Sequence, residues 1–273
     1  MTSLTAFLYH PAVYAGLLPL AIVLVVCALP GPAQSWRALT GVLAGFLVSA
    51  WMAIGSGLLA FDSTAKLVWA AVPVFALGGL FAARPRTLAA LHLLLALALP
   101  LWLIAPLITR EGLDAVVRYG YLPLFNLAVL AAFVRGGGSS RSNLAALLVL
   151  GMGVGSCAAL GASVLYAERA FSLAAGIGAL ALCLLLGREP WAGRGLALPV
   201  AQLLGTLAGL GTVYANLPVA ALVPLAAVPW MVRIPVPYGW GRAAHFALSS
   251  GYCILPATIA VAYVWHETGP PAF

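Results

Sequence analysis

Residues 135–166, RGGGSSRSNLAALLVLGMGVGSCAALGASVLY, hold the pattern that decides the fold. A short loop with two arginines comes first, and an apolar run over residues 143–166 without any charge follows it. A bilayer core of about 30 Å needs roughly 20 apolar residues in one helix. The run therefore predicts a membrane-spanning helix, and the loop predicts a short connection on one side of the membrane.

The same unit recurs along the whole chain. Hydrophobic residues make up 64% of the sequence and charged residues only 7%, against roughly 25% charged in soluble domains. No connection is long enough to fold by itself, so we predict one integral membrane domain over residues 1–273, an all-α polytopic transmembrane bundle of about ten spans. The ten apolar windows lie at residues 14–29, 38–60, 66–83, 87–107, 115–134, 143–166, 170–187, 196–214, 217–232 and 243–264.

The window at residues 217–232 is the weakest of the ten. It is short and contains Pro218, Pro224 and Pro229. Proline lacks a backbone donor and interrupts helices, so a re-entrant segment is the alternative. A chain that failed to cross here would leave Arg233 and Arg242 on the translocated side, and we therefore keep ten spans.

Basic residues fall on alternate connections. The odd-numbered connections hold nine arginines and one acid, a charge of 9 − 1 = +8: Arg37, Arg84, Arg86, Arg135, Arg141, Arg188, Arg194, Arg233, Arg242 and Glu189. The other connections and the C-terminal tail hold four basic and five acidic residues, a charge of 4 − 5 = −1: Lys66, Arg110, Arg118, Arg169, Asp62, Glu111, Asp114, Glu168 and Glu267. Cytoplasmic loops are enriched in Lys and Arg, so both termini are expected on the non-cytoplasmic side.

The net charge of +7 needs no special partner. It sits on the short loops that set orientation, where anionic lipid headgroups suffice to neutralise it. We expect the lipid bilayer as partner, and other integral membrane proteins, but no nucleic acid. The expected location is a bacterial-type inner membrane, crossed many times.

The acidic residues argue against a proton- or sodium-coupled transporter. All six fall in predicted connections, at span edges or in the tail. A charge at the bilayer centre costs about 2.5–3.5 kcal/mol or more and is kept there for ion pathways, proton relays or ligand pairing. Because no central carboxylate is predicted, we expect no coupled transport through one, and we expect no enzyme.

Two histidines form a candidate cofactor pair. His92 lies about one and a half turns inside the cytoplasmic end of the fourth predicted span, and we expect His245 at a similar depth in the tenth. Imidazoles at matching depth on two helices are able to ligate a b-type haem. Hydrogen bonding between helices is the simpler interpretation. A zinc site needs three or four converging ligands, and the sequence predicts none.

A few uncharged polar residues remain inside predicted spans. A solute pathway is one interpretation of them, and we select as its candidates Asn126, Gln202, Thr206 and Ser249. The alternative is local, because Asn126 and Gln202 each follow a proline by three positions. Proline frees a carbonyl in the preceding turn, which such an amide could satisfy.

Glycine spacing predicts close packing between helices. Gly151 and Gly155 are four residues apart, as are Gly41 and Gly45. Small residues at this spacing let two backbones approach closely in a membrane.

Three functions are compatible with these features. The absence of predicted buried charge favours a non-catalytic subunit or scaffold of a larger membrane protein complex. The span count and the proline-broken helices favour a passive or weakly coupled carrier for a small neutral or apolar solute. The histidine pair would suit a haem- or quinone-associated redox subunit.

Overall fold

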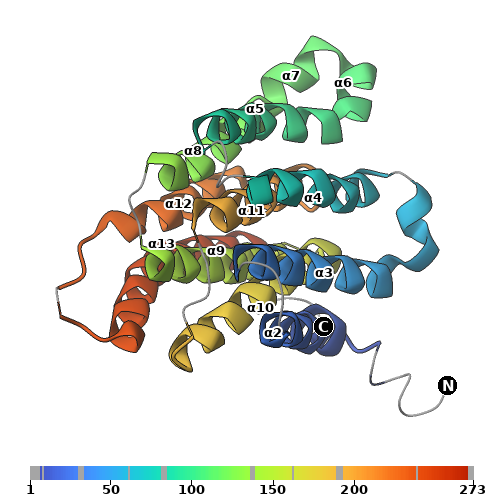
Figure 1. Ribbon diagram of the computed structural model, residues 1–273. Helices are drawn as coiled ribbons and strands as arrows, with labels where there is room; N and C mark the ends of the chain where they lie inside the picture. The colour runs from blue at the N-terminus through green and yellow to red at the C-terminus, as the bar shows by residue number, and fades with distance from the viewer. Residues whose placement is uncertain are drawn as a thin grey trace.

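The computed structural model describes residues 7, 9–29, 34–60, 62–80, 85–135, 139–161, 163–188, 193–237 and 239–269, and these residues form helices and no strands (Figure 1). Arg84 and Glu189, two residues of the charge pattern, lie outside the described residues, as do the turns at residues 30–32 and 136–138. The helices of the first half are η1 (Val13–Leu17), α2 (Leu18–Ala28), α3 (Gln34–Ile54), η2 (Gly55–Ala60), α4 (Ser63–Gly79), α5 (Pro85–Leu103), α6 (Ala105–Glu111), α7 (Leu113–Tyr119) and α8 (Tyr121–Arg135). Those of the second half are α9 (Ser140–Leu160), α10 (Val164–Leu185), α11 (Arg194–Tyr214), η4 (Val219–Ala221), α12 (Leu222–Ala227), η5 (Val228–Arg233) and α13 (Arg242–Thr268).

Seven helical stretches are long and apolar enough to cross a membrane. They are Ser35–Ile54, Pro85–Leu103, Leu113–Arg135, Ser140–Leu160, Val164–Leu185, Arg194–Tyr214 and Arg242–Thr268. Shorter apolar helices cover Val13–Ala28, Thr64–Gly79 and Val219–Arg233. The chain is therefore all-helical in its described part, with seven candidate membrane-spanning helices.

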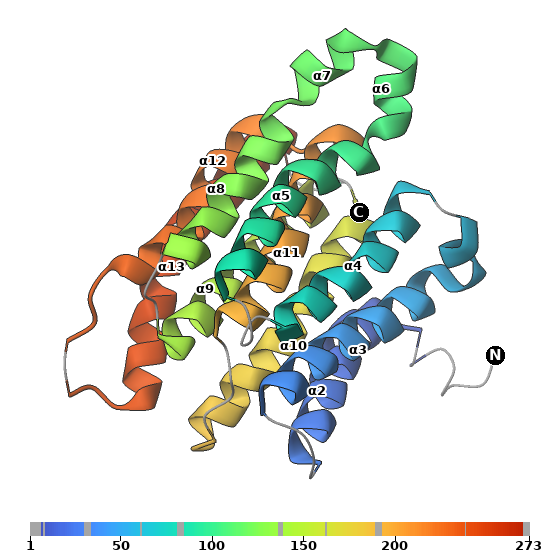
Figure 2. The same ribbon diagram turned by 45° about the horizontal axis from the view of Figure 1, so that its top comes forward.

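Helix α11 is the centre of the bundle. Every residue from Gly195 to Gly211 on it is buried. It packs against α4, α5 and α8 on one side and against α9 on the other, and α9 in turn packs against α10 and α13. Figures 1 and 2 show the resulting layers, with α5 and α8 on one face of the bundle and α2 and α10 on the other.

The predicted sixth window, residues 143–166, is wrong at its end. Helix α9 stops at Leu160, and α10 begins at Val164 because Ser163 caps it, its hydroxyl accepting a hydrogen bond from the backbone N–H of Tyr166. The apolar residues on both sides of this break conceal it from a hydropathy window. Glu168 and Arg169 consequently lie inside α10, which corrects their predicted place in a connection.

The stretch around residues 217–232 is helical but broken. It consists of η4, α12 and η5, with Pro224 inside α12 and Pro229 at the start of η5. The prolines explain the short segments, because each removes one helical hydrogen bond.

Glycines bring several helices into backbone contact. A Cβ atom on Gly45 would stand 3.0 Å from the Cα of Pro19 in α2, and one on Gly151 would stand 3.3 Å from the Cα of Ala174 in α10. A Cβ on Gly78 of α4 would collide with the carbonyl oxygen of Gly195 in α11. Glycine is thus required where α4 crosses the start of α11.

Candidate functional site

Four polar side chains meet in the middle of the bundle. His92 from α5, Asn126 from α8, and Gln202 and Thr206 from α11 are all buried, at 0 to 1% exposure. His92 Nδ1 and Gln202 Oε1 are 2.9 Å apart, and Asn126 Nδ2 donates to Thr206 Oγ1 over 3.1 Å. The Thr206 hydroxyl donates to the backbone carbonyl of Gln202 over 2.8 Å, which joins the two pairs. We call these four residues the polar seam.

The polar seam keeps three unused polar atoms. His92 Nε2, Asn126 Oδ1 and Gln202 Nε2 are buried and have no hydrogen-bond partner within the part of the chain that the structure describes. Leaving one such group unsatisfied costs about 1–3 kcal/mol, and buried polar groups in native proteins nearly always have a partner. The seam therefore offers donors and acceptors to a water molecule or a small polar solute.

A glycine on α11 makes room for the asparagine. A Cβ atom on Gly205 would collide with Asn126 Oδ1, so only glycine lets the amide reach the backbone of α11. Asn126 Nδ2 also contacts the carbonyl oxygen of Ala96 on α5, at 3.4 Å. Asn126 is thus held between α5 and α11, which flank it.

A second pair of polar groups lies further along α11, separate from the seam. The hydroxyls of Thr212 and Tyr121 are 2.6 Å apart at the far end of α11, where both side chains are half-buried. Gln202 and Thr212 are ten residues apart, which is about 15 Å along a helix. The seam and this second pair therefore lie within a stretch of about half of a bilayer core, without a hydrogen bond between them among the described residues.

Ser249, the fourth residue of the predicted pathway, lies in another cluster. Its hydroxyl is 3.3 Å from that of Ser142, and the Ser142 hydroxyl is 3.1 Å from His245 Nε2. Ser139 Oγ also approaches His245 Nε2, at 3.3 Å, while its oxygen caps α9 by accepting from the N–H of Ser142. The structure thus brings Asn126, Gln202 and Thr206 together and places Ser249 apart from them.

The sequence alone does not predict the contacts between serine and histidine, because Ser142 and His245 are 103 positions apart. A nucleophilic serine needs a base that a third group orients. Among the described residues, the imidazole ring of His245 has only the hydroxyls of Ser139 and Ser142 as hydrogen-bonding partners. The cluster resembles a capped helix start more than a catalytic triad.

The two histidines of the candidate haem pair bind different partners. His92 contacts Gln202 inside the bundle, and His245 contacts serines at the start of α9. In the part of the chain that the structure describes, no three His, Cys, Asp or Glu residues are close enough together to hold a metal ion.

The expectation of a bundle without buried charge is wrong. Arg169 is fully buried and is the largest such side chain, and Glu168 is only 7% exposed. Arg169 Nη2 contacts the carbonyl oxygen of Ala50 on α3 at 3.5 Å, and the hydroxyl of Tyr14 donates to Glu168 Oε1. Both residues lie in the second turn of α10. They directly follow the apolar run at residues 143–166, and for this reason the sequence alone suggests that they belong to a loop.

Comparison with known proteins gives no relative from which a function could be transferred. The sequence matches no known protein-family model, and no curated protein is similar to it.

Proposed function

We propose that the protein is a passive carrier for a small neutral solute that binds at the polar seam. The three unpaired polar atoms of His92, Asn126 and Gln202 are the observation that supports this function most. A solute with hydrogen-bond donors and acceptors would form hydrogen bonds with these three atoms in the place of water. None of the acidic residues that the structure describes takes part in the seam's hydrogen bonds, so the proposed transport does not depend on a central carboxylate.

In this proposal the chain crosses a bacterial-type inner membrane ten times, with both termini on the non-cytoplasmic side. The three shorter apolar helices would cross in addition to the seven candidate spans, which would make ten crossings. The alternation of basic connections sets the orientation. The protein is then not an enzyme, and it needs no cofactor for transport.

The orientation predicts which loops meet the cytoplasm. A cysteine in place of Ser139 should react with a membrane-impermeant thiol reagent only after the cytoplasmic face is opened, because the loop at residues 135–141 carries two arginines. A cysteine in place of Gly112, in the exposed turn between α6 and α7, should react in intact cells. Labelling of a cysteine at position 139 from outside intact cells would contradict the proposed orientation.

The transport proposal predicts a measurable flux. Liposomes containing the purified protein should swell faster than empty liposomes when glycerol or urea is the external solute, as followed by stopped-flow light scattering. Asn126→Leu should lower the rate about tenfold, because the loss of one buried hydrogen bond to the solute costs about 1.4 kcal/mol. Ser249→Ala, which removes a buried hydroxyl outside the seam, should leave the rate unchanged.

Two outcomes would contradict the carrier proposal. One is swelling at the rate of empty liposomes for both solutes. The other is an equal rate for the parent protein and for Asn126→Leu when both are folded and present in equal amounts.

A membrane-embedded subunit of a larger complex is the second candidate function. Two open apolar grooves flank α9, with volumes of about 590 and 510 Å³, and both are lined by Leu148 and Met152. Small residues at such a surface permit another helix to pack closely. Gentle extraction that yields other polypeptides in a fixed ratio with this chain would favour the subunit, whereas a solitary protein that transports a solute favours the carrier.

A further inference from the structure

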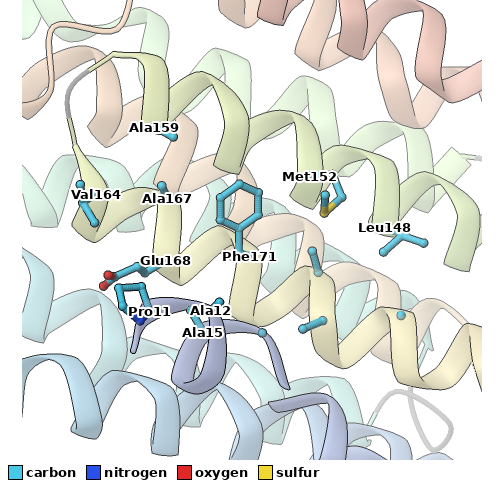
Figure 3. A pocket seen from close by; sticks show the side chains of 14 residues that line it. Pro11, Ala12, Ala15, Leu148, Met152, Ala159, Val164, Ala167, Glu168 and Phe171 are labelled. Carbon is cyan, nitrogen blue, oxygen red and sulfur yellow. The ribbon is translucent and has the colours of Figure 1, made fainter. Parts of the chain in front are cut away.

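The larger of the two grooves lies between α10, α9 and the N-terminal segment at residues 11–16. We call it the α10 groove, and it has a volume of about 590 Å³. Its walls are apolar and mostly small, with the ring of Phe171 standing in the middle (Figure 3). It is open rather than enclosed, so a molecule dissolved in the bilayer is able to enter it from the side.

One carboxylate lies at the end of this groove. Glu168 is the only charged residue among those that line it, and its side chain is more than nine-tenths buried. The hydroxyl of Tyr14 donates to one of its oxygens, and Glu168 forms no salt bridge with any residue that the structure describes. Figure 3 shows the carboxylate beside Pro11 and Val164, far from Leu148 at the other end.

The neighbouring cation does not occupy the groove. Arg169 is fully buried, reaches the carbonyl oxygen of Ala50 on α3, and is not among the residues that line the groove. Among the residues that line the groove, Glu168 therefore provides the one carboxylate in apolar surroundings.

The length of the groove limits the size of the molecule that is able to bind in it. From Glu168 to Gly178, both of which line it, ten residues of helix cover about 15 Å, which is half of a bilayer core. A slender apolar chain fits this length, and a cationic head would meet Glu168 at one end. The aromatic face of Phe171 is a further favourable neighbour for a cation.

We propose that the α10 groove binds a single-chain amphiphile with a protonated amine head, which pairs with Glu168. The alkyl chain lies along α10 toward Ala175 and Gly178. An anionic head would be repelled by the carboxylate, and a neutral head would form no ion pair with it. This site is separate from the polar seam, so its test does not depend on solute transport.

The test uses the full-length protein in dodecyl maltoside, a neutral detergent whose chain matches that of the probes. Dodecylammonium should raise the temperature of thermal unfolding in a concentration-dependent manner, and dodecanoate should not. Glu168→Gln keeps a hydrogen-bond acceptor for Tyr14 but removes the charge, and it should lower the apparent affinity for dodecylammonium roughly tenfold or more. The matched control Glu111→Gln removes an acid from the exposed end of α6 and should behave like the parent.

A second variant tests the chain-binding end of the groove. Ala175→Phe fills the groove away from Glu168, so it should abolish stabilisation by dodecylammonium and preserve the weaker stabilisation by hexylammonium. This comparison holds even if Glu168→Gln does not fold. Stabilisation by lysophosphatidylethanolamine as well as by dodecylammonium would identify a lipid amine as the ligand, and stabilisation by dodecylammonium alone would identify a free amine.

Three results would overturn the proposal. The first is equal stabilisation of the parent and of Glu168→Gln by dodecylammonium, and the second is equal stabilisation by dodecanoate. The third is a disulfide between a cysteine at Ala175 and another polypeptide in native membranes, because this would assign the groove to a protein partner.

Discussion

Gly78→Leu should prevent the bundle from folding stably. A Cβ atom at Gly78 would collide with the backbone carbonyl of Gly195 and stand 2.8 Å from Pro199 Cγ. Overpacking in a core costs about 1–3 kcal/mol and occasionally more, and we expect the upper end because a backbone atom is unable to swing aside. The central helix α11 would have to move away from α4. The effect is measured as the amount of protein in the membrane and its unfolding temperature in detergent.

The matched control is Gly251→Leu in α13. Gly251 is exposed and a Cβ atom there would meet nothing within 4 Å, so this variant should accumulate and unfold like the parent. If Gly78→Leu and Gly251→Leu have the same unfolding temperature, α4 and α11 do not approach each other closely at Gly78.

Gly155, which the four-residue spacing indicates as a packing position, is a less sensitive site. A Cβ atom there would stand 2.6 Å from Cδ1 of the Phe171 ring. That ring borders the α10 groove and has free space to turn into. The spacing of glycines therefore predicts where helices approach, but the cost of a larger residue depends on whether the atom opposite belongs to a backbone or to a movable side chain.

The sequence predicts the helical class well and the helix ends less well. Hydropathy averaged over a window detects apolar runs, because a membrane span must be apolar along its length. It misses the break at Ser163, since a capping hydroxyl between apolar residues hardly changes the average. The misplacement of Glu168 and Arg169 follows directly from this missed helix start.

The candidate site is predicted only in part. Asn126, Gln202 and Thr206 stand out because polar residues are rare in apolar spans, and they do lie together. The sequence suggests a haem pair of His92 and His245, whereas in the structure His92 forms a hydrogen bond with Gln202, which is 110 positions away. Helix adjacency decides such pairs, and a single sequence of apolar helices carries little information about which helices are neighbours.

The central claim is that the polar seam is a path for a solute, and that its hydrogen bonds do not serve only to stabilise the packing of the helices. A path must admit water and small molecules from the membrane surface. Thr206 is fully buried at the centre of the seam, and cysteine resembles threonine closely enough to replace it. The replacement is made after the four native cysteines have been changed to alanine.

The reactivity of a cysteine at position 206 toward a small uncharged methanethiosulfonate in native membranes tests this claim most directly. The carrier proposal predicts that Thr206→Cys is modified in intact cells and in everted vesicles, and that glycerol slows the reaction. Leu204→Cys, buried on the same helix but outside the seam, should remain unmodified. If Thr206→Cys is as inert as Leu204→Cys from both sides of the membrane, the seam is structural and the proposed transport is wrong.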